Sequence, residues 1–185
     1  MIALVLVSTA TARADEPEQP PAGAKPFLTG VEENVHTVTG AFGPAKDTMM
    51  VFTFNGQGEG SFSGFALVPD DKAKHGQRKL ALPRLPIGSI EGGIRTALVA
   101  NLDKDADDEL AIAFHVFRTV SDGKGDGFSY GTTEYVVLDW NGKKFVRLPA
   151  LEKKLVAKME SRESFQSSPL SDEDLRAALG VTQKP

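Results

Sequence analysis

Side chains that carry oxygen recur at alternate positions in the loop from Asn101 to Glu109, which reads Asn-Leu-Asp-Lys-Asp-Ala-Asp-Asp-Glu. Alternate side chains of a tight loop can converge on one point, and Ca²⁺ binds about six to eight oxygens in a flexible cage. We therefore predict a Ca²⁺ site whose ligands are the side chains of Asn101, Asp103, Asp105 and Glu109 and the backbone carbonyl of Asp107. The alternative is an acidic hairpin turn that binds no metal. Because five carboxylates within nine residues repel one another, the sequence favours a counter-ion.

Two apolar runs flank this loop and must position it. They are residues 96–100 before the loop and residues 110–116 after it. In the second run, side chains alternate between two faces with the period of a strand, and both faces are apolar. One face carries Leu110, Ile112, Phe114 and Val116, and the other carries Ala111, Ala113, His115 and Phe117. We predict a central strand covered on both sides, with C-terminal helices or a second sheet against the alanines.

The same alternation recurs along the chain between glycine, proline and Asn-Gly turn signals, which is typical of an antiparallel β domain. The expected strands span residues 35–42, 48–55, 61–68, 79–82, 94–101, 109–119, 132–140 and 143–148. We therefore predict a mainly β fold, either an antiparallel β-sandwich or a small propeller-like sheet, with about eight strands over residues 35–149.

The clearest turn is Asn141-Gly142, because a two-residue type I′ hairpin needs positive φ at both positions. In that register Trp140 faces Lys143, Asp139 faces Lys144 and Leu138 faces Phe145. The first pair predicts a cation–π contact, and the second predicts an opposite-charge pair.

After Pro149 the apolar period becomes helical. Leu151, Leu155 and Met159 predict an amphipathic helix over residues 150–160. A second helix is expected to begin after Ser171, a good N-cap with acids in the first turn, and to end at Gly180. Residues 150–180 are thus expected to cover the β domain, followed by a tail at residues 181–185.

The amino-terminal segment indicates export. An apolar run at residues 2–7 precedes Ala12-Arg13-Ala14, the small-x-small pattern of signal-peptidase sites. We predict a signal peptide over residues 1–14, with periplasmic or secreted localisation. The proline-rich segment that follows has few apolar side chains to bury, so residues 15–34 are expected to form a disordered spacer.

The acidic loop and its strand also resemble a known motif. Residues 98–114 are similar to the calcium loops of FG-GAP and VCBS-type repeats, whose pattern is Asp-x-Asp/Asn-x-Asp-Gly-x-x-Asp followed by an apolar strand. The resemblance implies a Ca²⁺-binding loop. Asn101 replaces the first acid of the pattern, and Ala106 stands where the pattern has glycine. The chain has one full copy, and residues 122–127 are better explained as a hairpin tip, so a complete propeller is not expected.

Composition narrows the function classes. The net charge of −4 and the lack of a basic cluster argue against nucleic acid as a partner, and the absence of cysteine excludes thiolate zinc sites and a cysteine nucleophile. The three histidines are isolated from one another in sequence. We predict a non-enzymatic β-module, not membrane-spanning, that binds an envelope protein or glycan and is stabilised by one Ca²⁺. The alternative is a metal-assisted hydrolase of envelope polymers that uses Asp103, Asp105 or Glu109.

Overall fold

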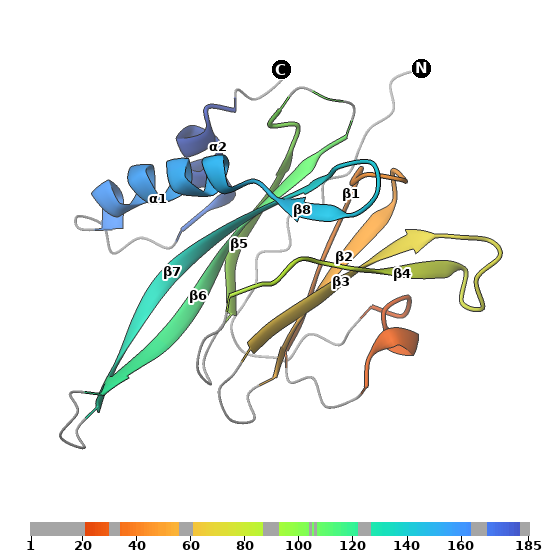
Figure 1. The fold of residues 1–185 in the computed structure, drawn as a ribbon, viewed down its shortest axis with the longest axis horizontal. Coiled ribbons are helices and arrows are strands. Elements are labelled where there is room, and N and C mark those ends of the chain that lie inside the picture. Colours follow the sequence, from red (N-terminus) through yellow and green to blue (C-terminus); the bar gives the residue numbers. More distant parts are fainter. Residues whose placement is uncertain are drawn as a thin grey trace.

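Two four-stranded antiparallel sheets form the protein, with two helices at the carboxyl end (Figure 1). The computed structural model describes residues 21–29, 34–55, 61–86, 93–103, 105, 107–121, 127–163 and 170–181. Each sheet is a meander in which successive strands pair, and both sheets are open. The predicted mainly β fold of eight antiparallel strands is confirmed.

The strand bounds agree with the predicted runs to within a few residues except in the long hairpin. The first sheet consists of β1 (Asn34–Gly40), β2 (Thr48–Asn55), β3 (Ser61–Pro69) and β4 (Gln77–Ala81). The second consists of β5 (Gly93–Ala100), β6 (Glu109–Ser121), β7 (Gly127–Trp140) and β8 (Phe145–Arg147). β6 and β7 are longer than predicted, because they pair as far as Ser121 and Gly127. Residues 122–126, predicted as the hairpin tip, lie outside the described residues.

The main core lies between the two sheets. The face of β6 with Leu110, Ile112 and Phe114 packs on residues of the first sheet, including Phe52 and Phe62. The Phe62 and Phe114 ring centroids are 4.8 Å apart. Side chains from both sheets thus fill one interior, so the architecture is a β-sandwich.

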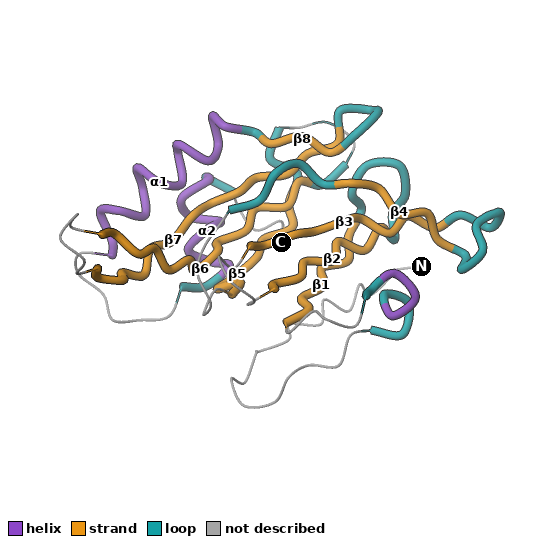
Figure 2. The backbone as a smooth tube through the Cα atoms, turned by 60° about the horizontal axis from the view of Figure 1, so that its bottom comes forward, coloured by secondary structure: helices purple, strands orange, loops and turns teal. Residues whose placement is uncertain are grey.

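The helices α1 (Pro149–Glu163) and α2 (Asp172–Leu179) cover the other face of the second sheet (Figure 2). Ala111 and Ala113 lie at the centre of this contact, where their small side chains allow the helices to approach closely. Leu155 and Leu175 are fully buried there. The prediction that β6 is covered on both sides is confirmed, and of the two covers predicted over its alanines, helices or a second sheet, the helices are the one observed.

The start of α2 has the N-cap that its sequence predicts. The Ser171 side chain accepts a hydrogen bond from the Asp174 backbone N–H, and the Asp174 side chain accepts one from the Ser171 backbone N–H. Gly180 ends the helix with a φ of 79°. No helix in the described part of the chain is long and apolar enough to span a membrane.

The predicted register of the Asn141-Gly142 hairpin is wrong by two residues. Trp140 pairs with Phe145, and their ring centroids are 4.9 Å apart. Four residues, 141–144, therefore connect the two strands. Within this loop the Asn141 side chain accepts hydrogen bonds from the backbone N–H groups of Lys143 and Lys144. The expected cation–π and opposite-charge pairs are therefore replaced by a ring contact within the core.

Residues 21–29, which belong to the segment predicted as a spacer, pack on the first sheet, and Asn34 at the end of that segment begins β1. Ala24 is fully buried, and the rings of Phe27 and Phe65 lie 6.5 Å apart. This part of the segment differs from the free spacer that its prolines suggest, because Ala24 and Phe27 bury apolar surface against β2 and β3.

Glu152 ties α1 to the second sheet, and its removal is expected to destabilise the protein. Its carboxylate accepts two hydrogen bonds from Arg147, at 2.7 and 2.8 Å, and a third from the Val137 backbone N–H at 3.2 Å. We expect Glu152→Ala to lower the free energy of unfolding by about 2 kcal/mol in urea titrations, because the buried Val137 N–H loses its partner. Glu152→Gln keeps an oxygen for that N–H, so a loss equal to that of the alanine variant would contradict the explanation.

Candidate metal site

The acidic loop joins β5 to β6 at one end of the sandwich. Ala100 and Glu109 are paired across the two strands, so the loop begins and ends at fixed points. Two short turns shape it. The Asp103 Oδ1 accepts a hydrogen bond from the Asp105 backbone N–H at 3.1 Å, and the Asp105 Oδ1 accepts one from the Asp107 N–H at 3.0 Å.

Four carboxylates meet at this loop. One oxygen from each of Asp103, Asp105, Glu109 and Asp139 lies within 4.8 Å of the others. Three of these residues were predicted as ligands, and the fourth, Asp139, comes from the end of β7. An all-carboxylate set is the chemistry that hard cations prefer in proteins. The cluster could therefore hold a metal ion.

Two members of the cluster are buried and incompletely bonded. Glu109 is fully buried and Asp139 is 9% exposed. The Glu109 Oε2 accepts hydrogen bonds from the backbone N–H groups of Leu102 and Asp103. The Glu109 Oε1 and the Asp139 Oδ1 are buried with no hydrogen-bond partner among the described residues. A buried carboxylate oxygen without a hydrogen-bond partner raises the free energy of the folded state, and a positive charge beside these two atoms would lower it.

The pKa values of Glu109 and Asp139 also indicate that the cluster lacks a compensating positive charge. Burial raises the pKa of Glu109 to about 7, and the charges of Asp103 and Asp105 add to this shift. Burial, followed by the charge of Asp103, also raises the pKa of Asp139 above its ordinary value. The site thus disfavours its own negative charges, and a bound cation would reverse this preference.

Two of the predicted ligands shape the loop. The Asn101 Nδ2 donates hydrogen bonds to the backbone carbonyls of Asp105 and Asp107, at 2.6 and 2.9 Å. The Asp107 Oδ2 accepts a hydrogen bond from the Gly43 backbone N–H at 3.0 Å. The Asp107 carbonyl, predicted as a ligand, thus accepts from Asn101, and its carboxylate lies outside the gathered group. Ala106 lies outside the described residues.

Comparison with known proteins adds no relative. No protein-family model, curated protein or solved structure matches this chain. The resemblance to FG-GAP and VCBS loops therefore still depends on residues 98–114 alone.

Asp139 was missed because it is far from the loop in sequence and reaches it only through strand pairing. Leu110 pairs with Leu138, so the preceding residue of β6, Glu109, lies opposite the following residue of β7, Asp139. Asp139 is also the one acid within the otherwise apolar run Tyr135–Trp140. Given the register, an acid at that position would have predicted the contact.

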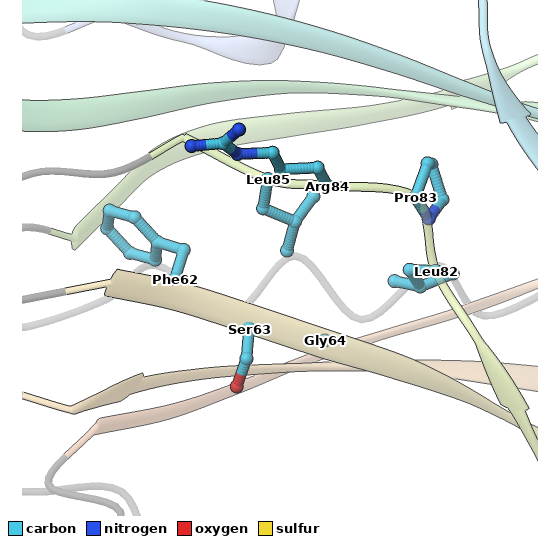
Figure 3. A pocket seen from close by; sticks show the side chains of 7 residues that line it. All are labelled: Phe62, Ser63, Gly64, Leu82, Pro83, Arg84 and Leu85. Atoms are coloured by element: carbon cyan, nitrogen blue, oxygen red, sulfur yellow. The ribbon is translucent and has the colours of Figure 1, made fainter.

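One pocket among the described residues shares no residue with this cluster. It has a volume of about 310 Å³ and lies between β3 and the segment after β4 (Figure 3). Apolar side chains and one exposed arginine line it, namely Phe62, Leu82, Pro83, Leu85 and Arg84. The Ser63 side chain points to the opposite side of β3 from Phe62 and Leu85 (Figure 3), and its hydroxyl is hydrogen-bonded to Thr53 Oγ1 at 2.6 Å.

Proposed function

We propose that this protein is an exported, non-enzymatic β-sandwich module that binds an envelope protein or glycan, and that one Ca²⁺ held by Asp103, Asp105, Glu109 and Asp139 stabilises it. The observation that carries the metal part is a pair of buried oxygens, Glu109 Oε1 and Asp139 Oδ1, which have no hydrogen-bond partner within the described part of the chain and lie beside two exposed carboxylates. The apolar run and the Ala12-Arg13-Ala14 sequence support export.

The number of carboxylates supports Ca²⁺ over Mg²⁺. One oxygen from each of four carboxylates lies within 4.8 Å of the others. In proteins Mg²⁺ usually keeps several waters and binds one or two carboxylates, whereas Ca²⁺ takes about six to eight oxygens, many of them from carboxylates. The ligand set also contains no nitrogen or sulfur, which argues against zinc and copper.

The position of the site supports a structural role for the ion. Asp103, Asp105 and Glu109 belong to the β5–β6 loop, while Asp139 belongs to β7, so one ion would join both. The same loop reaches the first sheet through Asp107, which accepts from Gly43. A second hydrogen bond runs from the Asp108 N–H to the Ala41 carbonyl at 3.1 Å. A bound cation would thus stabilise the end of the sandwich at which the β5–β6 loop contacts residues of the β1–β2 loop.

The hydrolase alternative requires an acid or base and a substrate cleft beside the metal. His115 is six residues from Glu109 along β6, which corresponds to about 20 Å in an extended strand. The described pocket is lined by residues 62–64 and 82–85 instead. Neither feature supports hydrolysis at the cluster, so the non-enzymatic function is preferred.

Thermal unfolding with Ca²⁺, with Mg²⁺ and with chelator tests the proposal. For a site with a dissociation constant of about 10⁻⁴ M, 10 mM Ca²⁺ is expected to add about 2.7 kcal/mol and to raise the Tm by about 5–10 °C. Asp139→Asn should abolish the gain, whereas the exposed Asp71→Asn should keep it. Equal shifts with Mg²⁺ and Ca²⁺, or none with either, would contradict a calcium site.

Lys104 provides a further control because it lies within the loop sequence, although outside the described residues. If its ammonium group were the counter-ion of the cluster, Lys104→Met would destabilise the cation-free protein. If Ca²⁺ is the counter-ion, the same variant should retain the calcium-dependent gain or increase it, because one competing positive charge is removed.

A further inference from the structure

The last strand of the first sheet, β4, has backbone groups that point away from the sheet. Its hairpin with β3 extends from the sandwich on the side away from α1 and α2 (Figure 1). The Asp70 N–H donates to the Gly76 carbonyl at 2.9 Å, so these two residues form a hydrogen-bonded pair. Such pairs alternate along an antiparallel ladder. In this register the N–H and C=O groups of Gln77, Lys79 and Ala81 point away from β3.

These outward groups can pair with another chain. No hydrogen bond joins them to any of the described residues, and the side chains of Lys79 and Ala81 are exposed. An open strand edge is a template on which an extended segment can add as a further strand, held by backbone hydrogen bonds.

The side chains around this edge are basic, although the chain is acidic overall. Residues 70–84 contain five Lys and Arg and two Asp, whereas the formal net charge of the whole chain is −4. The five basic side chains are exposed and form no ion pair with a described carboxylate, namely Lys72, Lys74, Arg78, Lys79 and Arg84. Basic side chains on an edge strand repel a second copy of that strand and attract a strand of opposite charge.

The positions of the charges favour a ligand that contacts both faces of the edge. Lys79 lies on the outer face of the sheet, where its Nζ is 3.9 Å from the centre of the Phe65 ring. Arg78 lies on the other face because side chains alternate along a strand. Neither face therefore presents the continuous basic surface that a nucleic acid would contact. A segment paired along β4 places adjacent side chains on both faces, one near Lys79 and one near Arg78.

We propose that β4 binds an acidic extended segment of a partner protein as an added strand. Backbone hydrogen bonds to Gln77, Lys79 and Ala81 hold the segment, and two adjacent carboxylates on it pair with Arg78 and Lys79. A glycan lacks the alternating N–H and C=O groups that continue a sheet, so a polypeptide is the preferred partner. This inference rests on the binding role in the proposed function and does not depend on the calcium site.

Fluorescence anisotropy of a labelled peptide with the full chain tests the inference. The probe is Thr-Val-Thr-Glu-Asp-Val-Thr-Val with blocked ends, and the control peptide has proline in place of each valine. The control has the same charge, but proline removes N–H groups that strand pairing needs. We expect the probe to bind at least about tenfold more tightly than the control.

Amide hydrogen exchange measured by NMR shows where the probe binds. The amides of Gln77, Lys79 and Ala81 should become protected when the probe is added. Those of Arg78 and Leu80 already face β3 and should change little. Peptide binding that leaves the three outward amides unprotected, or equal binding of the proline control, would show attraction by charge alone and overturn the inference.

Arg78→Glu should weaken binding of the probe about five- to tenfold, because an attractive pair becomes repulsive. Lys153→Glu on α1 is the matched control, since it changes the net charge equally at another exposed position, and it should bind like the native chain. Both variants should keep the thermal gain with Ca²⁺, so this test and that of the calcium site can fail separately. No binding of the probe, or tighter binding of polygalacturonate as an anionic glycan, would overturn the inference.

Discussion

Replacement of Glu109 with glutamine is expected to stabilise the cation-free protein at pH 8 and to remove most of its stabilisation by Ca²⁺. In the native chain, Glu109 is fully buried, and burial together with the charges of Asp103 and Asp105 raises its pKa to about 7. At pH 8 the folded protein therefore holds a buried carboxylate that it disfavours. Glutamine has nearly the same shape and no charge, and its oxygen can still accept from the Leu102 N–H.

The size and pH dependence of the effect follow from proton linkage. The raised pKa means that, between about pH 4.5 and 7, the folded protein retains a proton that the unfolded chain releases. The contribution of Glu109 to stability is therefore fully present below pH 4.5 and is lost as the pH rises to about 7. The loss is on the order of 3 kcal/mol at pH 8, and Glu109→Gln should recover much of it.

At the proposed calcium site the sign of the effect is expected to reverse. Bound Ca²⁺ would replace the proton on Glu109, so the calcium-dependent gain of the native chain should be larger at pH 8 than at pH 5. In Glu109→Gln the side-chain amide presents N–H groups where the native chain has an oxygen, and these cannot bind a cation. Urea unfolding of both proteins at pH 5 and pH 8, with and without Ca²⁺, measures all of these differences.

The control for this comparison is Asp71→Asn, an exposed acid away from the loop, which should change neither the pH slope nor the calcium gain. A glutamine variant that is less stable than the native chain at pH 8 without Ca²⁺ would show that the Glu109 charge is already compensated by the protein. The cluster would then need no cation.

The strands and helices could be predicted from the sequence because the signals for each one lie within the segment that forms it. The alternation along residues 110–116 predicts a strand with two apolar faces, and both faces are buried, one against the first sheet and one against the helices. Likewise, Ser171 and Gly180 mark the ends of α2 by their own side-chain and backbone preferences. Each of these predictions depends only on residues that are close together in the sequence.

What the sequence did not reveal depends on pairing between distant residues. Asp139 joins the cluster through the register of β6 and β7, in which Leu110 pairs with Leu138. The amino-acid types of residues 122–126 do not predict this register. The Asn141-Gly142 hairpin shows the same limit. Its dipeptide predicts a two-residue turn, but the Asn141 side chain and the contact of Trp140 with Phe145 favour four.

Gly43→Ala is expected to be strongly destabilising and to weaken calcium binding, although Gly43 is not a ligand. Gly43 has a φ of 58°, and a Cβ there would lie 2.4 Å from Trp140 Cγ and 2.6 Å from Trp140 Cβ. The left-handed conformation costs alanine about 1 kcal/mol, and the clash with a packed ring adds about 1–3 kcal/mol. To relieve the clash the loop must move, which strains the hydrogen bond from the Gly43 N–H to Asp107.

Gly76→Ala is the matched control because Gly76 also has a positive φ, of 69°, but nothing lies within 4 Å of its Cβ position. It should lose only the backbone part, about 1 kcal/mol in urea unfolding, and should bind Ca²⁺ like the native chain. The difference between the two variants then isolates the contact between the β1–β2 loop and Trp140. If Gly43→Ala lost stability but bound Ca²⁺ with native affinity, the acidic loop would be organised independently of the first sheet. A several-fold loss of affinity would instead show that the two sheets hold the ion together.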